Sequence, residues 1–320
     1  MSFDMEIEEW EDDLMIKNSN KGLLVTGGTG LVGSSIKADI KLSTKDVDLR
    51  DFQSTLTLFE NMRPNKVIHT AARVGGLGGN MNYKGEFFYE NIMINTNVLE
   101  SCRKVGVEKV VSFLSTCVFP DNVEYPLTEK KVHLGEPHSS NYPYAYSKRM
   151  LDIQSRAYRE QYEVNYVSII PTNVYGPRDN FDLKNGHVMP MLMHKCYLAK
   201  LNKTDLNVWG TGNALREFIY SEDVGKLTEC ALHNFEEVEP IIFSPSEEIP
   251  ISYMVDLIVE NMNFKGNVIY DTDKPEGQFR KPSDNSKLRS YLPDFKFTPI
   301  EVGMKKTVEW FIENYEKARK

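Results

Sequence analysis

The sequence predicts an α/β fold built on a parallel β-sheet with helices on both faces. Short apolar runs of strand length stand at 23–26, 66–71, 109–116 and 166–172, and helical stretches separate them. This alternation is typical of β–α–β units, because a parallel connection needs a crossover of about a dozen residues. The runs are mostly apolar along their length, which indicates strands that are buried on both faces of the sheet.

Two long helices belong to this pattern. Apolar residues from Glu86 to Val105 recur at helical spacing, and a second helix is predicted from Tyr144 to Tyr162, after turn residues at 139–143. After Pro177 the pattern loosens, Pro and Gly become frequent, and a last helix is expected near 299–317.

The chain is therefore divided into two domains and an extension. An open parallel sheet binds ligands in the crevice at the carboxyl ends of its strands, which here would lie between the domains. The expected parts are an N-terminal extension at 1–20, a sheet domain at 21–177 that includes roughly 216–245, and a smaller, less regular ligand domain at 178–215 and 246–320.

Composition excludes several classes of function. With 41% apolar and 26% charged residues, the 320-residue chain is ordinary for a globular protein. Its net charge of −8 disfavours a nucleic-acid surface. No apolar stretch is long enough to span a membrane, and the acidic N-terminus lacks the features of a signal peptide. The four cysteines show no paired spacing, which favours a reduced cytoplasmic protein and indicates no metal site.

A glycine-rich turn follows the first predicted strand. The segment TGGTGLVG at 26–33 fits both GxGxxG and GxxGxxG. A strand before it and a helix after it favour a Rossmann-type site, where a backbone without side chains lets a dinucleotide pyrophosphate approach the free N–H groups. A glycine-rich turn without a ligand is the alternative. The residues expected to contact the cofactor here are Gly27, Gly28, Gly30, Leu31, Val32 and Gly33.

The next segment leaves the choice between NAD and NADP open. Between Gly33 and Asp48 there is too little chain for a full crossover helix and a full second strand, so one of them must be short. Asp46 and Asp48 stand where an acidic residue binds the ribose 2′-hydroxyl of NAD. Lys45, beside Ser43 and Thr44, would instead suit the 2′-phosphate of NADP.

Tyr144 and Lys148 are predicted to be a proton-relay pair. Residues four apart share a helix face, and a lysine ammonium there can lower the pKa of a tyrosine from about 10 toward neutrality. The spacing also occurs at Tyr270 and Lys274, but Pro275 disfavours a helix at that place. The context selects the first pair, since a strand ending in Ser115, Thr116 and Cys117 precedes it. We therefore expect a nicotinamide-dependent oxidoreductase.

These motifs together resemble the extended short-chain dehydrogenases/reductases and, within them, the GDP-L-fucose synthases. The resemblance runs from about Gly22 to Lys320 and rests on VGG at 74–76, LSTCVFP at 114–120, PTNVYGPRDNF at 171–181, GHVMP at 186–190, VWGTGNALREFIY at 208–220 and DNSKLRSYLP at 284–293. It implies that GDP-4-keto-6-deoxy-D-mannose is epimerised at C3 and C5 and then reduced at C4 with NADPH.

The resemblance implies a role for each matching residue. Ser115 and Tyr144 would hold the C4 oxygen, and Tyr144 would protonate it. Lys148 would bind the nicotinamide ribose. Cys117 would be the base and His187 the acid of epimerisation, since a thiol and an imidazole titrate near neutral pH. Alone, Cys117 would more often be a small buried hydrophobic residue and His187 a loop residue; the other five histidines are expected to be structural or solvated.

The resemblance also implies the binding residues. Lys45 would meet the 2′-phosphate, which favours NADP(H). Further cofactor contacts would come from Asp48, Leu49, Ala71, Ala72, Tyr144, Lys148, Pro171 and Asn173. The GDP-sugar would be bound by Ser115, Asn173, His187, Lys195, Trp209, Arg216, Arg280 and Lys281. A homodimer paired through the helices at 86–105 and 144–162 is expected.

Two alternatives stay open at this point. One is a 4-reductase or 4-epimerase for another nucleotide sugar, which would need no Cys117 and His187 pair. The other is a dinucleotide-binding sensor or scaffold without activity, which would need the glycine-rich turn but not Ser115, Tyr144 and Lys148 together.

Overall fold

The structure is a computed structural model that describes residues 22–274 and 278–320. The predicted parallel sheet is confirmed. It contains six strands in the order β2-β1-β3-β4-β5-β9, all of them parallel. The strands are β1 (Leu23–Thr26), β2 (Ile40–Leu42), β3 (Lys66–His69), β4 (Lys109–Phe113), β5 (Asn165–Pro171) and β9 (Ile241–Phe243). The strand order reverses between β1 and β3, where ligands bind in such sheets. The expected extension at 1–20 lies outside the described residues.

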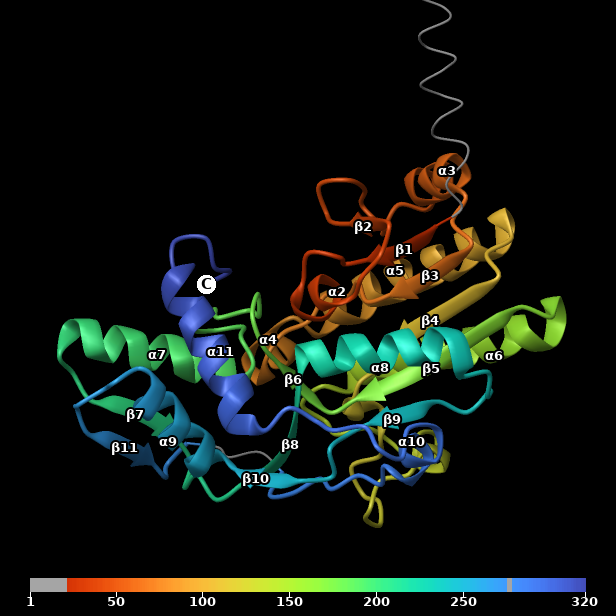
Figure 1. Cartoon of the computed structure of the whole chain (residues 1–320). Helices are drawn as coiled ribbons and strands as arrows, with labels where there is room; N and C mark the ends of the chain where they lie inside the picture. The colour runs from red at the N-terminus through yellow and green to blue at the C-terminus, as the bar shows by residue number, and fades with distance from the viewer. Residues whose placement is uncertain (1–21, 275–277) are drawn as a thin grey trace, which may run out of the picture.

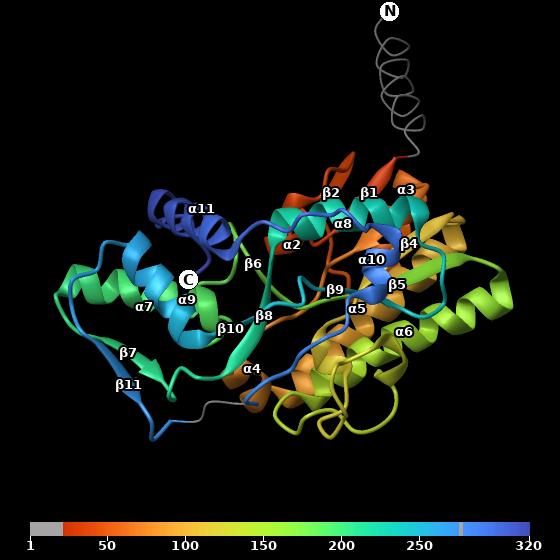
Figure 2. The ribbon, with the colours of Figure 1, turned by 60° about the horizontal axis from the view of Figure 1, so that its bottom comes forward.

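Helices cover the central sheet on both faces (Figures 1 and 2). One core packs the sheet against α3 (Phe52–Met62), α5 (Lys84–Val105) and α6 (Tyr142–Tyr162). The other core packs it against α8 (Ser221–Asn234) and α10 (Ser286–Tyr291). The two long helices that the sequence predicts are therefore confirmed. They pack directly against each other.

The first crossover is short, as expected from the sequence. The helix α2 (Leu31–Ser35) has 5 residues and β2 has 3, so both elements are reduced. The backbone N–H of Gly28 donates to the carbonyl of Leu42 at 2.8 Å, which holds the glycine-rich turn directly against β2.

Two predicted strands end earlier than the sequence suggested. The strand predicted at 66–71 ends at His69, and the one predicted at 109–116 ends at Phe113. Ser115 then accepts a hydrogen bond from the backbone N–H of Cys117 and begins the short 3₁₀ helix η1 (Thr116–Val118). Ser115 consequently caps η1 and Cys117 lies within it, rather than at a strand end.

A third core lies beside the central sheet, to its left in Figure 1. It contains residues from a sheet of order β10-β8-β6, from a parallel pair of β11 and β7, and from three helices. These elements are β6 (Asn173–Tyr175), α7 (Val188–Asn202), β7 (Leu206–Trp209), β8 (Leu215–Tyr220), β10 (Glu248–Pro250), α9 (Ile251–Asn261), β11 (Val268–Asp271) and α11 (Ile300–Glu313). The short helices α4 (Leu77–Asn82) and η2 (Glu129–Lys131) complete the described elements. Tyr270 lies on the strand β11, so Tyr270 and Lys274 do not share a helix, as expected.

Candidate active site

A cleft of about 1020 Å³ opens at the carboxyl ends of the central strands. It is lined by segments that follow β1, β3, β4 and β5, and by residues from the start of α7 and from α11 and the segment after it. The cleft is large enough for a cofactor and a substrate together, because ordinary ligand sites measure roughly 300–1,000 Å³.

The glycine-rich turn forms one wall of this cleft. Gly27 has a φ of +67°, and a Cβ on Gly33 would lie 2.3 Å from the carbonyl oxygen of Gly27. Neither position accepts a side chain without displacing the backbone, so the glycines leave the wall bare for a diphosphate. Five of the six predicted turn residues line the cleft, and Gly28 instead faces Lys41, whose Cβ would lie 2.6 Å from a Cβ added there.

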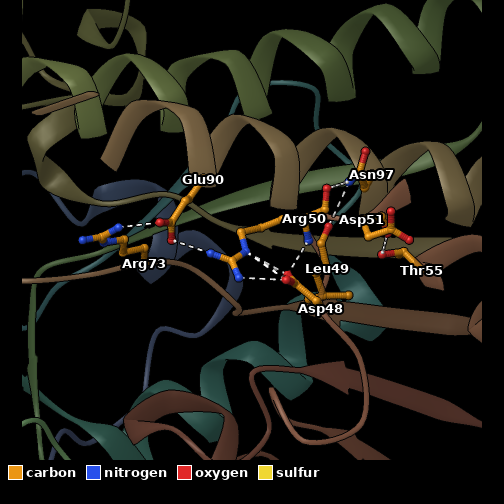
Figure 3. Close-up of polar contacts among 8 residues, drawn as sticks. All are labelled: Asp48, Leu49, Arg50, Asp51, Thr55, Arg73, Glu90 and Asn97. Carbon is orange, nitrogen blue, oxygen red and sulfur yellow. Dashed lines mark hydrogen bonds and ion pairs between the residues drawn. The ribbon is translucent and has the colours of Figure 1, made fainter. Parts of the chain in front are cut away.

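An alternating chain of charges lies along the β2 side of the cleft (Figure 3). The carboxylate of Asp48 accepts hydrogen bonds from Arg50, at 2.8 Å from Nε to Oδ1 and 2.7 Å from Nη2 to Oδ2. Glu90 pairs with Arg50 at 3.5 Å and also with Arg73. The hydrogen bonds from Arg50 hold the pKa of Asp48 below its ordinary value.

This chain of charges affects the choice of cofactor. An unpaired acidic residue in the position of Asp48 would repel a 2′-phosphate, but Arg50 neutralises that carboxylate. The adjacent Leu49 is buried and lines the cleft, and its carbonyl accepts from Asn97 at 3.0 Å. Lys45 is exposed and does not line the cleft, so its contact with the 2′-phosphate stays a prediction. Arg50, Arg73 and Glu90 could not be predicted from the sequence. They are far apart along the chain, and only the folded structure brings them into contact.

The structure brings Ser115, Tyr144, Lys148 and His187 together as linings of the same cleft. Lys148 is only 2% exposed, and its ammonium donates to the carbonyl of Phe113 at 2.8 Å. The same ammonium lies 5.9 Å from the centre of the Tyr144 ring. The other predicted cofactor residues Ala71, Ala72, Pro171 and Asn173 also line the cleft.

One expectation about this pair is wrong. We expected Lys148 to lower the pKa of Tyr144, but burial raises the pKa of Tyr144 well above its ordinary value, and the nearby Cys117 adds to the rise. Burial also lowers the pKa of Lys148 to about 8. Desolvation dominates because both side chains lie in the water-poor base of the cleft. Tyr144 is thus a neutral phenol that can donate a proton at neutral pH.

Cys117 lies just below the cleft surface. It is 9% exposed and is not among the lining residues. Burial raises the pKa of its thiol, while a hydrogen bond with Ser115 and the positive charges of Lys281 and Lys148 act in the opposite direction. Lys281, which the resemblance implies as a substrate residue, therefore lies close enough to Cys117 to favour its thiolate.

His187 stands at the start of α7 and lines the cleft. Its backbone carbonyl accepts from Met191 at 3.0 Å, which fixes the residue at the start of the helix. The surrounding protein lowers the pKa of the imidazole, and the charge of Arg319 lowers it further. The ring is therefore mostly neutral at pH 7, and its protonated form is a stronger acid than a free imidazolium.

The other predicted nucleotide residues lie outside the lining of the cleft. The ammonium of Lys195 stands 5.2 Å from the centre of the Trp209 ring, and Trp209 is 52% exposed. Arg216 donates to the carbonyl of Leu215 at 2.7 Å. Arg280 forms an ion pair with Glu248. The structure thus brings Lys195 and Trp209 together, and Lys281 and Arg216 close to each other.

Several cleft residues were not predicted from the sequence. Arg178 and Asp179 come from the loop after β6, and Trp310, Lys317 and Arg319 come from α11 and the segment after it. Burial raises the pKa of Asp179 to about 7. Arg178 and Asp179 stand inside the PTNVYGPRDNF segment at 171–181. No local pattern indicated that the C-terminal segment reaches the cleft. It does so because the backbone N–H of Phe181 donates to the carbonyl of Arg319 at 2.8 Å.

Within residues 22–274 and 278–320, no cluster of His, Cys, Asp and Glu could hold a metal ion. No helix in this part of the chain has the length and apolar character needed to cross a membrane.

Comparison with known proteins agrees with this geometry. Residues 23–244 match the model of the NAD dependent epimerase/dehydratase family. A GDP-L-fucose synthase of Dictyostelium discoideum is 50% identical and covers 94% of this chain and 98% of its own. A probable GDP-L-fucose synthase of Drosophila melanogaster is 43% identical over 94% of this chain and 100% of its own. The crystal structure of a GDP-L-fucose synthetase from Naegleria fowleri bound to NADP superposes with a TM-score of 0.88 at 47% identity, over 93% of this chain and 94% of that one. The chain therefore belongs to the NAD dependent epimerase/dehydratase family, and within it to the group of the GDP-L-fucose synthases.

Proposed function

We propose that this protein converts GDP-4-keto-6-deoxy-D-mannose into GDP-L-fucose by epimerisation at C3 and C5 and NADPH-dependent reduction at C4. The observation that supports this proposal most is that one cleft holds Ser115, Tyr144 and Lys148 together with His187, while Cys117 lies directly beneath. The first three suit a ketone reduction and the last two suit a proton exchange. The relatives named above have the same activity in their names.

Epimerisation uses the acidity of protons next to a ketone. The thiolate of Cys117 removes a proton from C3 or C5 and leaves an enolate on the C4 oxygen. His187 then returns a proton to the opposite face of the same carbon, so that each cycle exchanges one carbon-bound proton and inverts one centre. Lys281 and Lys148 favour the thiolate by their charge. The proton returned to carbon comes from the imidazolium form of His187, which the lowered pKa makes a stronger acid, and solvent or the Cys117 thiol restores that proton.

Reduction follows at C4, where bound NADPH supplies the hydride. Tyr144 donates its phenolic proton to the C4 oxygen, and Ser115 holds that oxygen by a hydrogen bond. Lys148, with a pKa of about 8, is mostly an ammonium at neutral pH and holds the ribose beside Tyr144. The bare glycine-rich turn, where a Cβ on Gly33 would meet backbone at 2.3 Å, fits the diphosphate of the cofactor.

We also propose how the chain divides this work. Residues 21–177 together with about 216–245 bind NADPH, and residues 178–215 together with 246–320 bind the sugar nucleotide. Lys195, Trp209, Arg216 and Lys281 contact the nucleotide, with Lys195 and Trp209 acting as one cation–aromatic unit because they lie 5.2 Å apart. Four free cysteines support a place in the reducing cytoplasm.

A second copy of the chain is the proposed partner. The exposed surface of α5 and α6, which pack against each other, carries large apolar side chains. Members of this surface include Phe88, Tyr89, Tyr142, Met150 and Ile153. A helix surface of this kind is suited to pair with its symmetry mate in a homodimer.

The exchange of protons tests the epimerase half. In deuterated water, Cys117→Ser should stop incorporation of deuterium at C3 and C5, which mass spectrometry of the sugar nucleotide detects. Cys230→Ser is the matched control, because Cys230 is a free thiol on α8 outside the cleft and its loss should leave exchange unchanged. Unchanged exchange in Cys117→Ser would sink the epimerase assignment.

Substrate dependence tests the reductase half. The purified protein should oxidise NADPH when it is given the 4-keto-6-deoxy sugar nucleotide and not in its absence. A folded protein that exchanges no protons and oxidises no NADPH would instead be a sensor. One that reduces without exchange would be a simple 4-reductase.

A further inference from the structure

The glycine-rich turn contains no positively charged residue. Its sequence from Thr26 to Gly33 is TGGTGLVG. Thr26 is buried and its hydroxyl contacts His69 at 2.8 Å, so within the turn only backbone groups and the Thr29 hydroxyl are available to a diphosphate. Charge-assisted hydrogen bonds to a phosphate are about twice as strong as neutral ones. A cation from elsewhere in the fold would therefore add to the binding of the cofactor.

Two cations flank this turn from opposite sides. On the β2 side, Lys41 packs against the turn, as the 2.6 Å separation between its Cβ and a Cβ added at Gly28 shows. On the other side lies the loop that follows β6. A Cβ on Gly176 would stand 3.5 Å from the side chain of Leu31, and both Leu31 and Arg178 line the cleft. Arg178 therefore belongs to the cleft wall that faces the turn.

Arg178 has no counter-charge in the part of the chain that the structure describes. No hydrogen bond or ion pair of its guanidinium occurs with the described residues, although it is exposed to the cleft. The adjacent Asp179 does not neutralise it, because that carboxylate is 97% buried, accepts from the backbone N–H of Asn180 at 2.6 Å and interacts with Arg319. The ammonium of Lys41 donates to the carbonyl of Ser34 at 3.1 Å.

The backbone at Arg178 is strained as well. Its φ of +66° lies in the left-handed region, which a non-glycine residue other than Asn or Asp rarely adopts. Arg178 and Lys41 are also close enough that the first lowers the pKa of the second, after the larger effect of burial. Two like charges thus lie close to the glycine-rich turn, and a bound diphosphate would reduce the repulsion between them.

We propose that Arg178 binds the pyrophosphate of NADPH opposite the glycine-rich turn, so that the loop after β6 holds the cofactor from the substrate side. Lys41, which does not line the cleft, adds only its nearby charge. This inference rests on the proposed function for the identity of the reductant. It differs from the expected contact of Lys45, which concerns the 2′-phosphate that distinguishes NADPH from NADH. The pyrophosphate is common to both cofactors.

The binding of NADPH and NADH to the protein without sugar nucleotide tests the proposal. Nicotinamide fluorescence gives both dissociation constants. Arg178→Asn removes the charge but keeps a residue that tolerates a positive φ, so the thermal unfolding midpoint should not fall. Affinity for NADPH and for NADH should decrease by the same factor, about tenfold, as expected for a lost charge-assisted contact. Arg178→Lys should restore most of the affinity, and Lys41→Gln should weaken both cofactors by a smaller equal factor.

Lys45→Gln is the matched control, because it should weaken NADPH and leave NADH unchanged. If Arg178→Asn weakens NADPH alone, Arg178 binds the 2′-phosphate and the proposal is wrong. Unchanged affinity for both cofactors would overturn it equally. If the variants change cofactor affinity as expected but the wild-type protein does not turn over the 4-keto sugar nucleotide, the proposed function fails and the pyrophosphate contact stands. A protein that binds neither cofactor overturns both.

Discussion

At the residue scale, burial decides the protonation of the groups that would carry the chemistry. Desolvation raises the pKa values of Tyr144 and Cys117 and lowers those of Lys148 and His187. All four shifts therefore favour the neutral form of the side chain. The cleft thus keeps the Tyr144 phenol protonated near neutral pH, while Lys281 and Lys148 provide a local positive charge for Cys117, the one group that must become an anion.

The two halves of the proposed reaction should consequently differ in their dependence on pH. Reduction should fall above about pH 8, since Lys148 loses its proton with a pKa of about 8. Proton exchange at C3 and C5 should not fall in that range, because the pKa of Cys117 is raised and the gain in thiolate as the pH rises offsets the loss of His187 imidazolium. Single-turnover NADPH absorbance and deuterium incorporation, both measured from pH 6 to 9.5, check this. Parallel profiles would contradict it.

Asp179 gives a prediction about stability. Its pKa is raised to about 7 by burial, so the folded protein holds a proton that the unfolded chain releases above about pH 4. This group stabilises the fold least above pH 7, and stability should decline as the pH rises from about 4 to 7. Asp179→Asn should remove that part of the decline and raise the free energy of unfolding at pH 8 by about 1–3 kcal/mol.

Urea unfolding of the wild-type protein and of Asp179→Asn at pH 5 and pH 8 measures this change in the free energy of unfolding. The Asn side chain can still accept from the backbone N–H of Asn180 through its carbonyl oxygen, as Asp179 does at 2.6 Å. A variant whose stability changes equally at both pH values would show that Asp179 is not protonated in the folded state.

Many of the residues that the sequence selected line one cleft in the structure, but the sequence did not predict their electrostatics. Tyr144 and Lys148 could be found because a four-residue spacing on a helix is visible in the sequence. Their pKa shifts could not, since these depend on how much protein surrounds each group. Arg178, Asp179 and Arg319 were missed for a related reason, because no local pattern marks residues that reach the cleft from another part of the fold.

At the scale of elements, the sequence was most informative where the elements are long. The helices expected at 86–105 and 144–162 are observed at Lys84–Val105 and Tyr142–Tyr162. The strands of the two smaller sheets have 3–6 residues, which is too short for a periodic pattern, so the sequence indicated only a less regular region there. The strand predicted to end at Thr116 ends earlier because the hydroxyl of Ser115 captures a backbone N–H.

The ends of these two helices provide a matched pair of substitutions. Both α5 and α6 end in a left-handed residue, Gly106 with a φ of +76° and Glu163 with a φ of +56°. Gly106→Ala should destabilise the protein by about 1 kcal/mol, and Glu163→Gly should stabilise it by a few tenths to 1 kcal/mol. A Cβ at Gly106 would meet nothing within 4 Å, so the first effect reports backbone strain alone.

Chemical denaturation of the two variants checks these values. The signs should be opposite, and cofactor affinity should not change, since neither residue lines the cleft. Equal signs would indicate that these caps do not control the ends of the helices.

At the scale of the whole molecule, the two cores on the faces of the central sheet and the third core beside it meet around the cleft. The class of fold followed from alternating strand and helix patterns, but the packing of α11 and the segment after it against the loop at 179–187 did not. In that packing Phe181 stacks on Phe311 with ring centres 4.2 Å apart, and His194 joins the carbonyl of Phe181 to the hydroxyl of Tyr315. Such long-range contacts have no signature in a single sequence.

The proposed homodimer can be tested with two matched isoleucines. Ile153 on α6 and Ile312 on α11 are each 43% exposed. Ile153→Glu places a charge in the proposed interface and should convert a dimer into a monomer, as light scattering after size exclusion would show. Ile312→Glu lies on another surface and should leave the mass unchanged. A monomeric wild-type protein would contradict the proposal directly.

The loop after β6 carries one residue proposed to contact the cofactor and another proposed to contact the sugar. Arg178 stands near its start and His187 at its end, and the hydrogen bond from Phe181 to Arg319 fixes the stretch between them. If the cofactor fixes the position of Arg178 and the sugar fixes that of His187, each ligand should tighten the binding of the other by the same factor. The cofactor would then dissociate more slowly from the complex that also holds the sugar nucleotide than from the protein that holds the cofactor alone.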